Sequence, residues 1–158
     1  EQLLGEEGMG FVYLMQDLPQ ERLSVAINAI ANARSILDQT IEYVKERKAF
    51  GKSVATFQNT QFKLAEMDTD LTVAEAYMDR CLQLHVEEKF DSVAAAKCKL
   101  MSTDLQCKVI DECLQLHGGY GFMWEYPVAR AFADARVQRI YAGTNEIMKL
   151  IIGRDLVK

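Results

Sequence analysis

Apolar residues recur at steps of three and four over most of this 158-residue chain, and this spacing constrains the fold more than any other feature. Such a period places apolar side chains on one face of an α-helix. It extends over about residues 20–47, about 57–88, and from residue 92 to about 117. The three predicted stripes consist of Leu23, Ile27, Ile30, Ala33, Leu37, Ile41 and Val44, of Leu64, Met67, Leu71, Ala74, Met78 and Cys81, and of Cys98, Met101, Leu105, Val109, Cys113 and Leu116.

Short breaks separate these stripes. The segment "FGKSVAT" (50–56) is typical of a loop, and "KFDS" (89–92) is typical of a turn with Asp91 or Ser92 as a helix cap. Gly118-Gly119 supplies the left-handed residue that commonly ends a helix. Long helices joined by short loops must run antiparallel to their neighbours.

Two shorter helices are expected after these glycines. One starts at Pro127 and ends near Val137, and the other is capped by Thr144. We therefore predict an all-α fold, an up-down-up-down four-helix bundle with a short extra helix.

The opening of the chain is less regular. Residues 1–9 are predicted to be a linker from a missing upstream domain, and residues 10–158 are predicted to be the bundle domain. Pro19 fits the first turn of a helix, because that position needs no backbone N–H, and it equally fits a kink in a helix that began near Gly10.

Composition excludes several classes of function. A formal net charge of −5 with scattered basic residues argues against a nucleic-acid-binding role. No apolar run approaches the roughly 20 residues of a membrane span. The cysteines form no C-x-x-C pair or common zinc pattern, and His85 has no partner at ligand spacing, so we expect no metal site. Buried, reduced thiols are expected instead at Cys81, Cys98, Cys107 and Cys113.

Charged residues at two helix ends have both a structural and a functional interpretation. Glu21 is either a first-turn acid stabilised by the helix dipole or a general base on a rigid helix, and Arg22 is either a surface charge or an anion clamp. In "ERKAFGK", Arg47, Lys48 and Lys52 either complement a helix C-terminus or grip a pyrophosphate.

Two glycine-containing segments suggest a binding site. "QLHGGYGF" has three glycines in four residues, more than a helix stop requires, which indicates close approach of a ligand to the backbone. "RIYAGTNEIM" has the form of a site loop, yet Tyr141 to Thr144 include no carboxylate, histidine or cysteine.

Four motifs occur in the same order and at the same separations in one known family. "LPQERL", "ERKAFGK", "QLHGGYGFMWEYP" and "RIYAGTNEIM" together resemble the C-terminal domain of an acyl-CoA dehydrogenase, most closely the long-chain type. Each motif alone is weak, whereas the ordered set is specific. The resemblance extends from about Gly5 to the last helix.

The resemblance implies a flavoprotein oxidoreductase of fatty acid β-oxidation. Family members use FAD to convert a fatty acyl-CoA to the trans-2-enoyl-CoA, and they pass electrons to an electron-transfer flavoprotein. They are typically homotetramers, assembled as dimers of dimers, and they occur in the bacterial cytoplasm or the mitochondrial matrix. Because the family's flavin also contacts a central β domain, we expect the isolated chain to be inactive.

The resemblance also implies site residues by position. Residues 115–119 match a glycine stretch that meets FAD from the neighbouring subunit. The implied cofactor-binding residues are Arg47, Lys48, Ala49, Phe57, Gln58, Gln115, Leu116, His117, Gly118, Gly119, Thr144, Asn145 and Glu146, and the implied substrate-binding residues are Pro19, Gln20, Glu21, Arg22, Ala142 and Gly143.

One position departs from the pattern of many family members. Their catalytic glutamate directly precedes the Gly-Thr of the last loop, where this chain has Ala142. The long-chain and isovaleryl types instead carry the base on the first long helix, before an arginine, and this position matches Glu21. We therefore expect Glu21 to be the catalytic base. An acyl-CoA oxidase, an isovaleryl-type enzyme and a non-catalytic helical assembly module remain open alternatives.

Overall fold

The computed structural model describes residues 3–158, so the first two residues of the predicted linker lie outside it. Its helices and strands follow the predicted order, with a small hairpin added after the first helix. In chain order they are α1 (Gly10–Glu46), β1 (Lys48–Ala49), β2 (Lys52–Ser53), the 3₁₀ turn η1 (Val54–Thr56), α2 (Gln58–Val86), α3 (Ser92–His117), the 3₁₀ turn η2 (Gly118–Phe122), α4 (Pro127–Gln138) and α5 (Asn145–Leu156).

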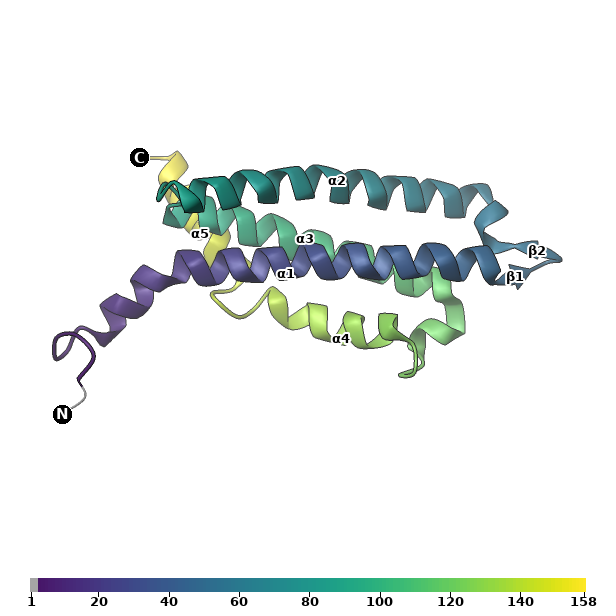
Figure 1. The fold of residues 1–158 in the computed structure, drawn as a ribbon, viewed down its shortest axis with the longest axis horizontal. Coiled ribbons are helices and arrows are strands. Elements are labelled where there is room, and N and C mark those ends of the chain that lie inside the picture. The colour runs from purple at the N-terminus through teal and green to yellow at the C-terminus, as the bar shows by residue number, and fades with distance from the viewer. Residues whose placement is uncertain (1–2) are drawn as a thin grey trace.

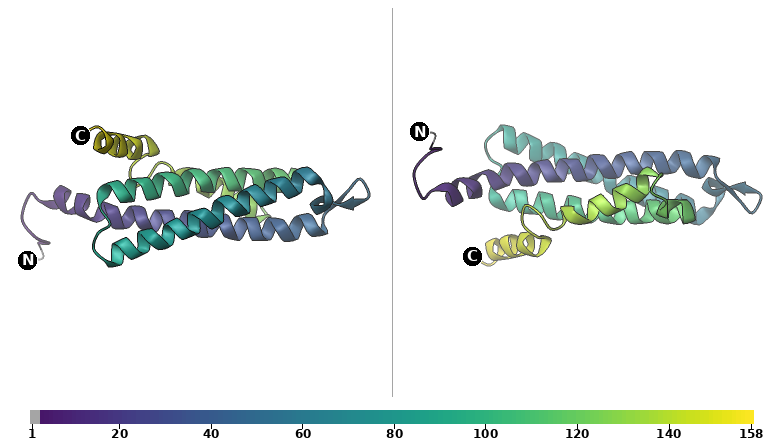
Figure 2. Two further views of the ribbon diagram at one scale, coloured as in Figure 1. Left: turned by 90° about the horizontal axis from the view of Figure 1, so that it is seen from above. Right: turned by 90° about the horizontal axis from the view of Figure 1, so that it is seen from below.

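The four-helix bundle is confirmed, with α5 as the extra helix. Helices α1 to α4 alternate in direction, and both chain termini lie at one end of the bundle (Figure 1). Helix α3 is central, since it packs against each of α1, α2, α4 and α5. Helix α5 lies to one side of the bundle (Figure 2). No helix within residues 3–158 is long and apolar enough to cross a bilayer.

Local capping explains where several helices begin. Asp91, one of the two predicted caps, accepts hydrogen bonds from the amides of Val93 and Ala94. The predicted cap Thr144 accepts from the Ile147 amide. Each side chain thus satisfies main-chain donors that the first turn of a helix leaves free.

Pro19 lies inside α1, so the alternative that it begins a helix is wrong. The helix starts nine residues earlier, at Gly10. Proline removes one main-chain hydrogen bond and its ring crowds the preceding turn, which bends a helix. Figure 1 shows the first turns of α1 angled away from the rest of this helix.

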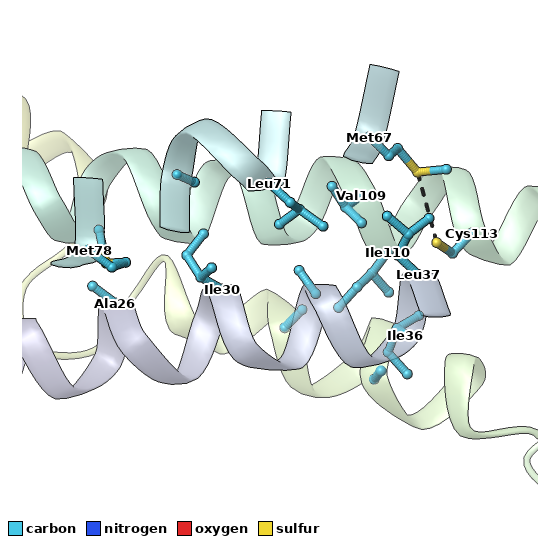
Figure 3. Packing of buried hydrophobic residues seen from close by; sticks show 14 of the residues in the cluster. Ala26, Ile30, Ile36, Leu37, Met67, Leu71, Met78, Val109, Ile110 and Cys113 are labelled. Atoms are coloured by element: carbon cyan, nitrogen blue, oxygen red, sulfur yellow. Dashed lines mark hydrogen bonds between the residues drawn. The ribbon is translucent and has the colours of Figure 1, made fainter. Parts of the chain in front are cut away.

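The predicted stripes form most of the apolar core. Leu37 and Leu71 are fully buried, and they pack in one cluster with side chains from α3 and α4 (Figure 3). Ile27 is an exception, because it is 36% exposed and lies outside this cluster. The cysteines are free thiols as expected, and Cys107 is only half-buried.

Replacing Leu71 with alanine should destabilise the fold by about 2–5 kcal/mol, because the deletion leaves a cavity in a close-packed core. Val73, on the same helix, is 67% exposed. Val73→Ala should therefore change the free energy of unfolding by about 0.5 kcal/mol or less. Urea denaturation followed by circular dichroism measures both values. Equal effects of the two substitutions would contradict the packing described for α2.

Candidate functional site

Arg22 connects α1 to the loop between α4 and α5. Its side chain is buried, and Nε donates a hydrogen bond to the Ala142 carbonyl at 3.1 Å. Burial lowers the pKa of the Arg22 guanidinium, while the adjacent Glu21 carboxylate acts in the opposite direction. The structure thus brings together Arg22 and Ala142, two of the predicted substrate-binding residues. Glu21 itself is exposed.

The turn at Ala142 and Gly143 has an unusual main-chain conformation. Ala142 has φ of 54° and Gly143 has φ of 93°, so both lie in the left-handed region. This region is costly for alanine and free of strain for glycine. A side chain at Gly143 would also lie 2.9 Å from Cε of the buried Met148 and 3.5 Å from the Arg22 guanidinium. The tight packing explains why a glycine occupies this position.

Polar side chains of α3 support the turn from below. The Lys99 ammonium donates to the Gly143 carbonyl at 2.8 Å and to Oδ1 of Asn145 at 2.9 Å. The Asn145 amide nitrogen in turn donates to Thr103 and to Asp104. The Asn145 side chain is buried, and its main-chain N–H donates to the Arg139 carbonyl at 3.0 Å, so Asn145 ties the start of α5 to α3 and to the end of α4.

The turn also leaves donors unused. Within residues 3–158, no hydrogen bond uses the main-chain N–H of Ala142 or of Gly143. Free main-chain N–H groups on a fixed turn can stabilise a negatively charged oxygen. The turn therefore offers available donors, and it is bonded to Arg22, the residue that follows Glu21 on α1.

A second group of predicted residues lies at the hairpin end of the bundle. A hollow of about 420 Å³ is lined there by the following residues: Arg47, Val54, Gln115, Leu116, His117, Gly118, Gly119, Tyr120 and Met123. A Cβ added at Gly118 or at Gly119 would meet no atom within 4 Å. The glycines thus leave open space beside an exposed guanidinium.

Aromatic stacking fixes the wall of this hollow. The rings of Tyr43 and His117 stack with centroids 4.1 Å apart, and the Arg47 guanidinium lies 5.2 Å from the Tyr120 ring centroid. Nδ1 of His117 lies 2.8 Å from the Cys113 carbonyl, which can only accept, so Nδ1 carries the proton. Burial lowers the pKa of His117, which favours the neutral ring.

The remaining predicted cofactor residues surround the hairpin or begin α5. Lys48 and Ala49 form β1, Phe57 precedes α2 and Gln58 is its first residue. Thr144 and Glu146 lie at the start of α5, at the other end of the bundle (Figure 1). Helix α1 rises roughly 1.5 Å per residue, so Arg22 and Glu46, the last residue of α1, are about 36 Å apart along the helix axis. The structure therefore separates the predicted residues into two sites.

Sequence reasoning missed two supporting residues. Both Lys99 and Tyr43 lie outside every motif that the sequence contains. One signal was present for Lys99, since it begins a polar series on α3 at helical spacing. That series is buried and consists of Lys99, Ser102, Thr103 and Gln106.

Comparison with known proteins identifies relatives along nearly the whole chain. A family model described as "Acyl-CoA dehydrogenase, C-terminal domain" matches residues 8–157. Mitochondrial long-chain specific acyl-CoA dehydrogenases of Sus scrofa and Mus musculus are 55% and 56% identical over 155 residues. That alignment covers 98% of this chain and 36% of each relative, so the chain spans little more than a third of their length.

Solved structures agree with this match. The crystal structure of acyl-CoA dehydrogenase from Geobacillus kaustophilus superposes with a TM-score of 0.93 at 49% identity, over 98% of this chain and 40% of that chain. Butyryl-CoA dehydrogenase from Megasphaera elsdenii gives a TM-score of 0.92 at 39% identity, over 98% of this chain and 40% of that one.

His117 should make stability depend on pH. Because its folded pKa is lowered, the unfolded chain binds the proton more readily, and stability is lost as pH falls below the unfolded value of 6.5. His117→Phe keeps an aromatic ring beside Tyr43 but cannot titrate. Between about pH 7.5 and about pH 5.5, this variant should lose less stability than the unmodified chain in urea denaturation.

The chain offers a matched control for this measurement. His85, the other histidine, is exposed on α2. His85→Phe should leave the acid-induced loss as large as in the unmodified chain. If His117→Phe also leaves that loss unchanged, then His117 is not the titrating group.

Proposed function

This chain belongs to the acyl-CoA dehydrogenase family and corresponds to the C-terminal domain of its members. We propose that it takes part in the FAD-dependent conversion of fatty acyl-CoA to trans-2-enoyl-CoA. The observation that carries this proposal is the bond from Arg22 to the Ala142 carbonyl. It holds the helix that bears Glu21 beside a turn with free main-chain N–H groups. A carboxylate and an oxyanion donor at one place are what α-proton abstraction from a thioester needs.

Glu21 acts as the general base in this proposal. Its carboxylate removes the proton from the α-carbon, and the negative charge that develops moves to the thioester oxygen. The Ala142 N–H donates to that oxygen and so stabilises the charge. A base on a long helix is held more precisely than a base on a loop. Bound FAD supplies the acceptor for the hydrogen that leaves the β-carbon as hydride.

The hollow at the hairpin end fits part of FAD. The exposed Arg47 guanidinium can pair with the pyrophosphate, and Tyr120 contributes an aromatic face beside it. The open space at Gly118 and Gly119 lets a ligand approach the main chain. The other residues proposed for this contact are Lys48, Ala49, Phe57, Gln58, Gln115, Leu116 and His117.

The separation of the two sites supports an oligomer. Thr144, Asn145 and Glu146 are proposed to contact the cofactor of their own subunit, at the start of α5. The hollow lies about 36 Å away along α1 and is proposed to contact the cofactor of a neighbouring subunit. A dimer of dimers would provide both arrangements.

The proposals for substrate, electron acceptor and location rest on the family to which the chain belongs. We propose a fatty acyl-CoA, of the long-chain class, as the substrate that Pro19, Gln20 and Gly143 help to bind. An electron-transfer flavoprotein is proposed as the acceptor. The proposed location is the mitochondrial matrix or the bacterial cytoplasm. The chain alone lacks most of the length of its relatives, so activity is proposed for the intact protein only.

Glu21→Gln in the intact protein tests the assignment of the base. The amide keeps the size of the side chain but cannot accept the α-proton. Bleaching of the flavin by an acyl-CoA should slow by roughly 100-fold to 10,000-fold, the usual contribution of general base catalysis. Rapid mixing followed by flavin absorbance measures this rate.

A second acid on α1 provides the control. The Glu42 side chain is 69% exposed and pairs with Lys45. Glu42→Gln should leave the bleaching rate unchanged. Bleaching at the native rate in Glu21→Gln would exclude Glu21 as the base. Fast reoxidation of the reduced flavin by oxygen would instead favour an acyl-CoA oxidase.

A further inference from the structure

Lys99 is a buried cation for which the proposed reaction has no direct use. Its side chain is fully buried on α3, near the turn at Ala142 and Gly143. None of the ion pairs within residues 3–158 involves it, and its ammonium donates only to the Gly143 carbonyl and to Oδ1 of Asn145. Its partners are thus two neutral oxygens of the turn and of the first residue of α5.

Burying such a charge opposes folding. Burial lowers the pKa of Lys99 to about 8, and Arg22 from α1 and Arg139 after α4 act in the same direction. Asp104 on α3 and Glu146 on α5 partly offset them. An apolar side chain of similar length would avoid this cost. Fold stability therefore does not explain why this position is a lysine. The two oxygens that its ammonium binds offer another explanation.

The turn needs contacts from other parts of the chain to keep its conformation, because its backbone is strained. Ala142 is in the left-handed region, and such residues persist only when surrounding contacts determine them. Arg22 fixes the Ala142 carbonyl and Lys99 fixes the next one, so two successive peptide planes are held. Since a trans peptide points its N–H opposite its C=O, these bonds directly orient the N–H groups of Gly143 and Thr144. The Ala142 N–H, the donor in the proposed reaction, belongs to the preceding peptide, which is joined to the held planes at the Cα of Ala142.

We propose that Lys99 is a positioning residue. Together with Arg22 it holds the turn at Ala142 and Gly143, so that the main-chain donors of the turn and the carboxylate of Glu21 face the same thioester. The two cations come from different helices, α3 and α1, and they bind adjacent carbonyls of one turn. The turn is thereby fixed relative to the helix that carries the base. The catalytic part of this inference rests on the proposed function, whereas the hold on the turn does not.

Lys99→Met in the intact protein tests the inference, because methionine matches the length of lysine without a donor. Hydrogen–deuterium exchange should show loss of protection in residues 139–148 and unchanged protection in α2. The rate of flavin bleaching at saturating acyl-CoA should fall by roughly 10-fold to 100-fold, the effect of misplacing a reacting group by about 1 Å. The substrate Kd from the same experiment should change by less than about threefold, since the acyl and CoA contacts remain.

Lys97→Met is the matched control, because Lys97 lies two residues away on the same helix and is exposed. It should change neither measurement. If Lys99→Met does not fold, Lys99→Leu, which also lacks a donor, replaces it in the same comparison.

Two results would overturn the inference. Unchanged exchange in residues 139–148 would show that Lys99 does not hold the turn. Faster exchange there with an unchanged bleaching rate would show that the hold has no catalytic consequence. Failure of the unmodified protein to bleach with any acyl-CoA would instead overturn the proposed function and with it the catalytic role of Lys99, and the exchange data alone would then decide the structural one.

Discussion

The hydrogen bond from Arg22 to the Ala142 carbonyl joins residues 120 positions apart and makes a site out of two separate segments. Helix α1 contributes a carboxylate, and the turn before α5 contributes main-chain donors. Neither segment alone has the groups that removal of an α-proton requires. The turn has no acidic side chain, so its contribution is its backbone and its compact shape.

The bundle makes this connection precise. Helix α3 packs against α1, and its lysine and threonine side chains support the same turn that Arg22 holds. A close-packed apolar core resists small displacements, so side chains mounted on it keep their relative positions. The buried polar groups beneath the turn bring folding cost rather than gain, which is the usual balance at a functional site. The length of α1 also separates the two sites, so one long helix serves both the turn and the hollow.

Periodicity and capping residues predicted most of the fold. The steps of three and four in the stripes of α2 and α3 match buried side chains, and Asp91 and Thr144 cap helices as expected. Pro19 could not be assigned from sequence, because proline fits both a first turn and a kink. Ile27 follows the stripe in sequence but is partly exposed, since the contact face of α1 depends on its neighbours.

The residues of the site were predictable only where the sequence contains motifs that also occur in the acyl-CoA dehydrogenase family. Those motifs contain Arg22 and Ala142, but the bond between them depends on how α1 meets the loop. Lys99 was missed because lysine is almost always exposed, and its burial depends on oxygen acceptors from a distant segment. The Tyr43–His117 stack was missed for the same reason, as it joins residues 74 positions apart through tertiary packing.

The most direct test of this account is a crystal structure of the intact protein with FAD and a non-reactive acyl-CoA thioester analogue. In that structure the Glu21 carboxylate should contact the α-carbon, and the thioester oxygen should lie about 3 Å from the Ala142 main-chain nitrogen. An α-carbon beside another carboxylate, with Glu21 directed to solvent, would contradict it.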